Sequence, residues 1–170
     1  MEILIAGLIL VAFMAYASTR IKRSAAKAFE AETVETEQFV IQKPDGFLNV
    51  INGDPQFAFE AYSKEFGTGD ASAIRIGTAT IKISDAGSDP AVSIKESGTD
   101  IASDIKEVIG EKHYRLIEGK RVNKAIDLRV LYKMAESKGK TFVLEITTLP
   151  EAPDEFSRKI ESMLDSFEIK

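Results

Sequence analysis

The chain has 170 residues, of which 44% are hydrophobic and 29% charged, with a net charge of −5, one histidine and no cysteine. This length suits one domain plus an accessory segment, and the acidic charge argues against nucleic acid as a partner. The absence of cysteine excludes disulfides, thiolate metal sites and a lipid-modified cysteine anchor, and a single histidine excludes a multi-histidine metal site.

The N-terminal segment has the character of a membrane span. Residues 3–17 (ILIAGLILVAFMAYA) carry no charge, and Ser18 and Thr19 extend the uncharged run. As a helix this run covers roughly 25 Å, close to the ~30 Å hydrocarbon core of a bilayer. We therefore predict a single transmembrane helix whose depth is set by long cationic side chains that reach the lipid headgroups. These flanking cations are Arg20, Lys22, Arg23 and Lys27.

A cleaved signal peptide is the alternative for this segment, because Ala15-Tyr16-Ala17 has the form of a cleavage site. A signal peptide carries basic residues ahead of its apolar run, whereas only Met1 and Glu2 precede this one, so we favour the anchor. The cations follow the run, and the positive-inside rule then keeps the following domain in the cytoplasm. We predict a single-pass protein of the inner (cytoplasmic) membrane with a cytoplasmic domain; an exported domain is the alternative.

Beyond the span, helical spacing continues through an alanine-rich stretch to about residue 32. It is either a solvated stalk or a helix that docks on a partner through Ala25, Ala28 and Phe29. Residues 33–37 (TVETE) are expected to form an acidic linker. The predicted organisation is therefore a transmembrane helix with a juxtamembrane stalk over residues 1–37 and one α+β domain over residues 38–170.

The domain shows strands, a helix, a strand meander and a final helix. Strands are predicted over residues 39–42, 56–66 and 74–83, with a bulge or bend at Gly77, and a helix capped by Thr99 is predicted over residues 99–110. Strands then follow over residues 113–117, 126–134 and 142–146, with a hairpin turn at residues 137–140. The last segment has one apolar helical stripe. We expect an antiparallel sheet flanked by helices. The stripe consists of Phe156, Ile160, Met163, Leu164 and Phe167.

Three segments of this domain resemble the PsbP/DcrB type of α/β/α sandwich. They are KPDGF (residues 43–47) after the first strand, the late strand TFVLEIT (141–147) and the helix end LDSFEIK (164–170). PsbP is the extrinsic protein of photosystem II, so the resemblance implies a PsbP-like fold and an association with photosynthetic or respiratory electron transport. DcrB-type members are usually lipoproteins or exported, and this chain departs from them by its missing cysteine and its positive-inside bias. A START-like fold is the alternative.

No combination of residues indicates catalysis, a cofactor or a bound metal. His113 has no partner residue in the sequence pattern for general-base work, and it is expected to face solvent. It lies in a basic stretch that can form a solvated face or contact an acidic partner or anionic lipid. The candidate contact residues of this stretch are Lys112, His113, Arg115, Lys120 and Arg121.

These features favour a non-enzymatic accessory subunit of a larger membrane complex. Its partners would be integral membrane protein subunits and membrane lipid, with protein–protein interaction through the span and the domain. The alternative is a membrane-tethered small-ligand or lipid-binding protein. That alternative requires a cavity between the sheet and the terminal helix, close to Phe156, Ile160, Leu128 and Tyr132.

Overall fold

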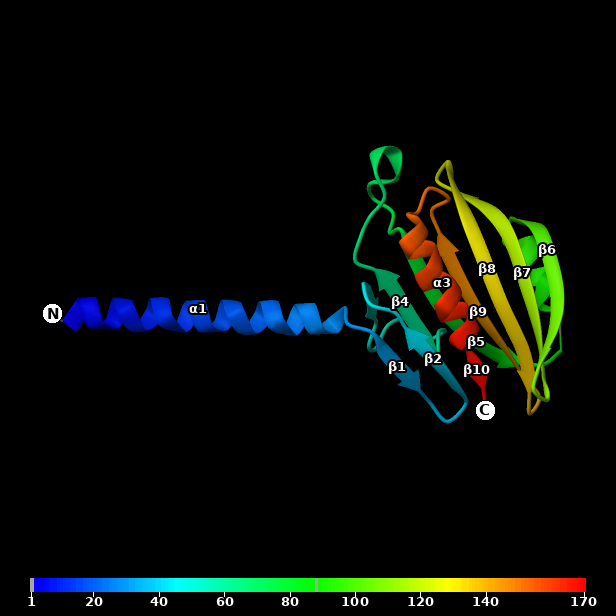
Figure 1. Ribbon diagram of the computed structural model, residues 1–170, viewed down its shortest axis with the longest axis horizontal. Coiled ribbons are helices and arrows are strands. Elements are labelled where there is room, and N and C mark those ends of the chain that lie inside the picture. The colour runs from blue at the N-terminus through cyan, green and yellow to red at the C-terminus, as the bar shows by residue number, and fades with distance from the viewer. Residues whose placement is uncertain (1, 88) are drawn as a thin grey trace.

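The computed structural model describes the backbone of residues 2–87 and 89–170, and the side-chain surroundings within this set except at residues 2–10, 12, 22, 23 and 25. The first helix, α1 (Glu2–Ala28), is about 40 Å long and projects away from the folded domain (Figure 1). Within the described part of the chain, no helix is both long and apolar enough to cross a bilayer.

A seven-stranded antiparallel sheet forms the centre of the domain. Its spatial order is β3-β4-β5-β9-β8-β7-β6, so the strands from β6 to β9 follow one another as a meander, and β5 pairs with the last of them. The strands are β3 (Phe47–Asn49), β4 (Phe59–Ser63), β5 (Gly77–Asp85), β6 (Thr99–Ile109), β7 (Lys112–Asn123), β8 (Ile126–Ser137) and β9 (Lys140–Thr148).

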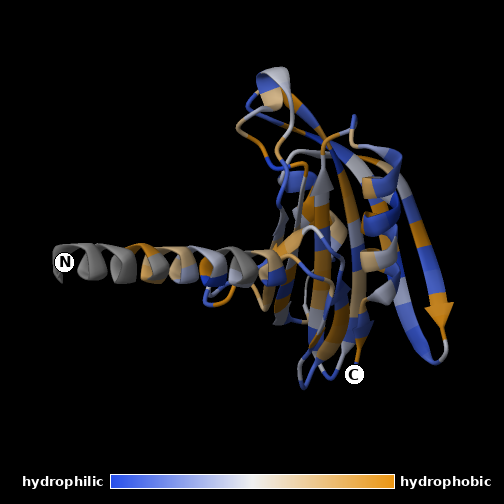
Figure 2. Cartoon of the chain, turned by 60° about the vertical axis from the view of Figure 1, so that its left-hand side comes forward, coloured by the Kyte–Doolittle hydropathy of each residue, from blue (hydrophilic) through white to orange (hydrophobic). Residues whose placement is uncertain are grey.

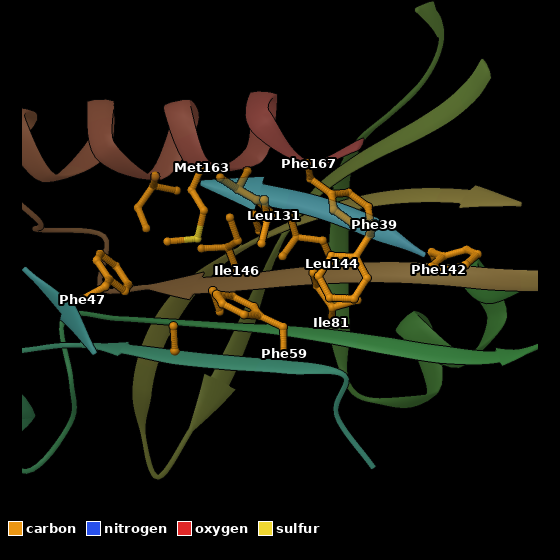
Figure 3. Close-up of a cluster of buried hydrophobic side chains, with 14 of the residues drawn as sticks. Phe39, Phe47, Phe59, Ile81, Leu131, Phe142, Leu144, Ile146, Met163 and Phe167 are labelled. Atoms are coloured by element: carbon orange, nitrogen blue, oxygen red, sulfur yellow. The ribbon is translucent and has the colours of Figure 1, made fainter. Parts of the chain in front are cut away.

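One face of this sheet is covered by α3 (Asp154–Ser166) and by a three-stranded sheet of order β1-β2-β10. The strands of the small sheet are β1 (Glu32–Glu35), β2 (Phe39–Lys43) and β10 (Glu168–Ile169). Phe156, Ile160 and Met163 of α3 are buried in one core with inward-facing side chains of β9, as the apolar stripe predicts. Figure 3 shows Met163 pointing from α3 toward Ile146 in this core. The β9 residues of this core are Phe142, Leu144 and Ile146.

The opposite face carries a second, smaller core under α2 (Pro90–Glu96) and the segment that follows the short 3-10 helix η1 (Gly69–Ala71). Ala91 and Ile94 of α2 are buried there. The alternation predicted along β8 is confirmed, because every second residue from Leu128 to Met134 points into this core. The sheet is therefore covered on both sides, as expected for an α+β sandwich.

The helix predicted over residues 99–110 is wrong: this segment is strand β6. The helix lies earlier, as α2, where Asp89 Oδ1 accepts a hydrogen bond from Ala91 N at 3.0 Å and proline occupies the first turn. Gly98, with φ +80°, follows α2 and leads into β6. Residues 99–109 are rich in isoleucine, valine and threonine, which favour a strand once β7 supplies the hydrogen-bonding partner.

Two smaller expectations also need correction. Residues 33–37 were expected as a linker, but β1 covers most of them and pairs with β2 in the small sheet. No bulge occurs at Gly77, because β5 begins at this residue and its register with β9 is continuous from Gly77 to Asp85. The chain bends at Ile76 instead, directly before the strand. A Cβ at Gly77 would lie 2.7 Å from the ring of Phe156, so close packing under α3 explains the glycine.

Candidate functional site

The junction between α1 and the domain is built around a buried cation. Lys43 is 1% exposed, and its Nζ donates hydrogen bonds to the carbonyl of Glu30, just after α1, and to the carbonyl of Phe47 at 2.8 Å. The amide of Gly46 donates to the carbonyl of Phe29 at 2.7 Å. Burial lowers the pKa of Lys43. The KPDGF segment is therefore the element that ties the end of α1 to the domain.

Of the predicted stalk residues whose side chains are described, Phe29 contacts the domain. Its side chain is half-buried, and its ring centroid lies 5.9 Å from Lys64 Nζ. Ala28, Arg20 and Lys27 are exposed on α1. The side chains of Ala25, Lys22 and Arg23 lie outside the described residues. The roles of these residues toward a membrane or a partner stay predictions.

The basic residues of the second candidate surface all lie on β7, but they alternate between its two faces. Lys112 and Lys120 point to the side of α3, whereas His113, Arg115 and Arg121 point to the side of α2. Two of the three arginine and histidine side chains on the α2 side are paired. Arg121 forms an ion pair with Glu145, and Arg115 forms ion pairs at 2.7 Å with both Asp89 and Asp104.

The ion pairs of Arg115 hold α2 to the sheet. Asp89 caps α2, and its pKa is lowered first by the hydrogen bond from the Ala91 amide and then by Arg115. Asp104 lies on β6, and the hydrogen bond from Arg115 lowers its pKa. Arg115 therefore links α2 to β6 through two partly exposed carboxylates, a mainly structural use of a residue that was predicted to contact a partner.

Three of the five candidate residues on β7 line one groove, of about 1070 Å³. This groove lies at the end of the sheet where the chain terminates, between the start of α2, the β6–β7 turn and the β8–β9 hairpin. Its wall includes Lys112, His113 and Arg115, whereas Lys120 and Arg121 lie outside it. His113 is exposed at its rim. We refer to this feature as the terminal groove.

The wall of the terminal groove depends on the last residues of the chain. Lys112 Nζ donates to the carbonyl of Ile169, and the Ile169 amide approaches the Tyr114 hydroxyl at 3.4 Å. Burial raises the pKa of Tyr114. Thr141, also in the wall, is 3% exposed and its Oγ1 has no hydrogen-bond partner among the described residues. These residues form a concave surface of mixed charge.

Two expectations about binding chemistry can be placed on the structure. Among the described residues, no group of three or more histidine, aspartate or glutamate side chains is arranged to hold a metal ion. Phe156 and Ile160 belong to the core under α3, whereas Leu128 and Tyr132 belong to the core on the opposite face of the sheet. These four side chains therefore do not enclose a common ligand cavity, so they do not form the cavity that the ligand-binding alternative requires.

The architecture defines a PsbP/Mog1-like fold. No family model and no curated protein sequence matches the chain. The solution structure of cyanobacterial PsbP (CyanoP) from Synechocystis sp. PCC 6803 is similar, with a TM-score of 0.61 and 12% identity over 84% of this chain and 94% of CyanoP.

Two further solved structures share this arrangement. LpqN, involved in cell envelope biogenesis of Mycobacterium tuberculosis, has a TM-score of 0.56 and 12% identity over 83% of this chain and 91% of LpqN. The Ran-binding protein Mog1p of Saccharomyces cerevisiae has a TM-score of 0.56 and 11% identity over 83% of this chain and 96% of Mog1p. The predicted PsbP-like fold is thus confirmed at the level of fold.

Proposed function

We propose that the protein is a non-enzymatic accessory subunit, held in the membrane by residues 3–19 and docking its α+β domain on integral membrane proteins. The observation that carries this proposal is the apolar surface of the projecting helix. The five large apolar side chains between residues 11 and 21 are 60–69% exposed. They are Val11, Phe13, Met14, Tyr16 and Ile21. Figure 2 shows hydrophobic positions along the described part of this helix, which projects from the domain. Apolar side chains displayed together in this way require lipid or a partner surface to cover them.

The junction supports a docking role close to the membrane. Lys43 and Gly46 hold the carbonyls of Glu30 and Phe29, so the domain follows α1 without a flexible linker. Residues 20–28 add only about 13 Å of helix beyond the proposed span. A domain tethered this closely reaches partners at or near the bilayer surface.

The partner is proposed to be protein. Likeness to CyanoP makes photosynthetic or respiratory electron-transport complexes the first place to search, and the Ran-binding Mog1p illustrates that such a fold can bind a protein. The test is purification of the full chain from its native membrane in mild detergent, followed by native electrophoresis. Migration as a free protein of 18.7 kDa plus its micelle would refute the subunit proposal.

The terminal groove is the proposed docking surface on the domain. Glutamate substitutions at His113 and Lys138, both exposed in its wall, should weaken co-purification of partners, because they place negative charge on the proposed contact surface. Neither side chain forms an ion pair with a described residue, so the fold should be kept. Lys82→Glu, at an exposed position of β5 outside the groove, is the matched control. Equal loss in the control and the groove variants would refute a specific role for this surface.

The domain is proposed to lie in the cytoplasm, since Arg20, Lys22, Arg23 and Lys27 follow the uncharged run. Protease added to spheroplasts should then leave the domain intact. Exchanging Arg20, Lys22 and Arg23 for glutamine while adding two lysines after Met1 should make it accessible. Digestion of the unmodified domain from outside would support the exported alternative instead.

A further inference from the structure

A second concave site lies at the end of the sheet opposite the terminal groove. It is a cavity of about 520 Å³ between the loop that carries η1, the β7–β8 turn and the segment joining β9 to α3. These three segments lie together at the top of the domain in Figure 1. We refer to it as the η1 cavity. Its volume falls within the range of small-molecule sites, ~300–1000 Å³.

The η1 cavity combines an apolar lining with carboxylates, and no described residue of its lining is cationic. Its apolar surface comes from aromatic, aliphatic and proline side chains, among them Phe66, which is 46% exposed. Among the described residues that line it, Asp70, Asp127 and Glu151 are the only charged ones, and none of the three forms an ion pair with a described residue. Three unneutralised carboxylates around an apolar surface favour a positively charged partner.

The wall of the η1 cavity is held in place by a stacked arginine. Arg75 lies 3.9 Å from the ring centroid of Phe66 and 4.5 Å from that of Tyr62. Its Nη1 donates to the carbonyls of Ser63 at 3.1 Å and Lys64 at 2.9 Å, so this cation is engaged outside the cavity. The cavity wall is therefore organised before a ligand arrives, which lowers the entropic cost of binding.

Close packing fixes the adjoining loop as well. The amide of Gly67 donates to the carbonyl of Ile74 at 2.9 Å, and that of Leu149 to the carbonyl of Ile76 at 3.0 Å. A Cβ on Gly67 would lie 2.5 Å from a methyl group of Leu149. The loop thus approaches Leu149, directly after β9, at a distance that favours glycine at position 67, and the cavity lies beside this contact.

The turn at the mouth of the η1 cavity is strained. Lys124 and Ala125 have φ values of +50° and +65°, which place both central residues of the β7–β8 turn in the left-handed region. Glycine or asparagine normally occupies these positions, and the other such turn in the meander has glycine at its second position, Gly139. Strained backbone of this kind concentrates at ligand-binding sites.

We propose that the η1 cavity binds a small ligand with an apolar body and a positively charged end. The apolar body would lie against Phe66, Ile76 and Leu149, and the cation would face Asp70, Asp127 and Glu151. This inference goes beyond the role as a membrane-complex subunit. The cavity can be occupied whether or not the domain is bound to a partner.

The test is a titration of the isotope-labelled full chain in nonionic detergent with three probes that share one phenylpropyl body. Phenylpropylammonium carries a positive charge, phenylpropanol is neutral and phenylbutyrate is negative. We expect amide shifts at Gly67, Ala71 and Ala125, with affinity decreasing in that order of probes. With charges about 6 Å apart in water, each carboxylate should contribute about threefold to the affinity for the ammonium probe.

Variants separate the two parts of the proposal. Asp127→Asn and Glu151→Gln lie on exposed side chains and should each weaken phenylpropylammonium about threefold, leaving phenylpropanol unchanged; Glu161→Gln on α3 is the matched control. Ala71→Leu should reduce binding of all three probes, whereas Ala73→Leu, exposed and outside the lining, should not. Equal affinity for the three probes, or shifts confined to other regions, would overturn the inference. Either result would leave the proposed membrane role standing, because that role is read from native complexes.

Discussion

Replacing Lys43 with methionine tests the proposed junction between α1 and the domain. Methionine keeps the length and much of the volume of the lysine stem, but it removes the buried charge and both hydrogen bonds of Nζ. The carbonyl of Glu30 belongs to an exposed residue, so water can replace the lost donor there. Phe47 is 0% exposed, so its carbonyl would lose its 2.8 Å hydrogen bond to Lys43 and have little access to water.

The magnitude follows from these two environments. A buried carbonyl without a partner costs about 1–3 kcal/mol. Burial lowers the pKa of Lys43, which means that the folded protein already bears a cost for keeping this ammonium charged, and the substitution removes that cost. We expect Lys43→Met to lower the free energy of unfolding by about 2 kcal/mol, near the middle of this range.

Urea denaturation measures the loss of stability, and hydrogen exchange measures its location. The amide of Gly46, bonded to the carbonyl of Phe29 at 2.7 Å, should exchange faster in the variant. Lys64→Met is the control, because Lys64 is exposed and contacts the same junction only through the ring of Phe29. A change in the free energy of unfolding below about 0.5 kcal/mol, together with unchanged exchange at Gly46, would refute the role of Lys43 in holding α1 to the domain.

Three further outcomes follow from the packing and the charges. Ile160, on α3, is 1% exposed, and Ile160→Ala should lower the free energy of unfolding in chemical denaturation by about 2–4 kcal/mol. Val92, on α2, is 53% exposed, and Val92→Ala should lower it by under about 0.5 kcal/mol. Similar losses at both sites would contradict the assigned core. Because Arg115 lowers the pKa of Asp104, their pair stabilises the fold above the ordinary aspartate pKa and loses that contribution as pH falls through the lowered one. Arg115→Gln should thus reduce the acid-induced loss of stability, by no more than about 1 kcal/mol at this partly exposed site; identical pH profiles would argue against it. Gly119→Ala would place a Cβ 2.6 Å from a backbone oxygen of β6 and should cost about 1–3 kcal/mol, with faster exchange of β6 amides; wild-type stability would show that β6 can shift without penalty.

Local patterns predicted the parts of the fold where one periodicity dominates. The apolar stripe of α3 repeats at helical spacing, and β8 alternates over four buried residues from Leu128 to Met134. The hairpin turn predicted at SKGK is confirmed as well. Lys138 and Gly139 both adopt positive φ there, with glycine at the second position. In each case the signal and its structural cause lie within about a dozen neighbouring residues.

Segment 99–109 shows where local patterns fail. Ile101, Ile105 and Val108 have helical spacing, but a register shift between Ile101 and Ser103 redistributes the residues that follow over the two faces of β6. Pairing with β7, a long-range contact, selects the strand. The terminal groove and the η1 cavity have the same origin, because each is formed by segments from distant parts of the chain.

The sequence by itself determined the charge balance, the apolar N-terminal run with its following cations, and the order of most strands and of the final helix, because these depend on residue type and short-range spacing. The tertiary structure alone decided which charged side chains are buried and hold separate segments together through hydrogen bonds. Lys43 is held by carbonyls on either side of it in the chain, and Lys133, 2% exposed, donates to the carbonyls of Leu164 and Asp165 at the end of α3. A lysine is buried at such a position only where the fold brings backbone acceptors to its ammonium group. The spacing of residues within one segment cannot predict this, because the acceptors come from other segments of the chain.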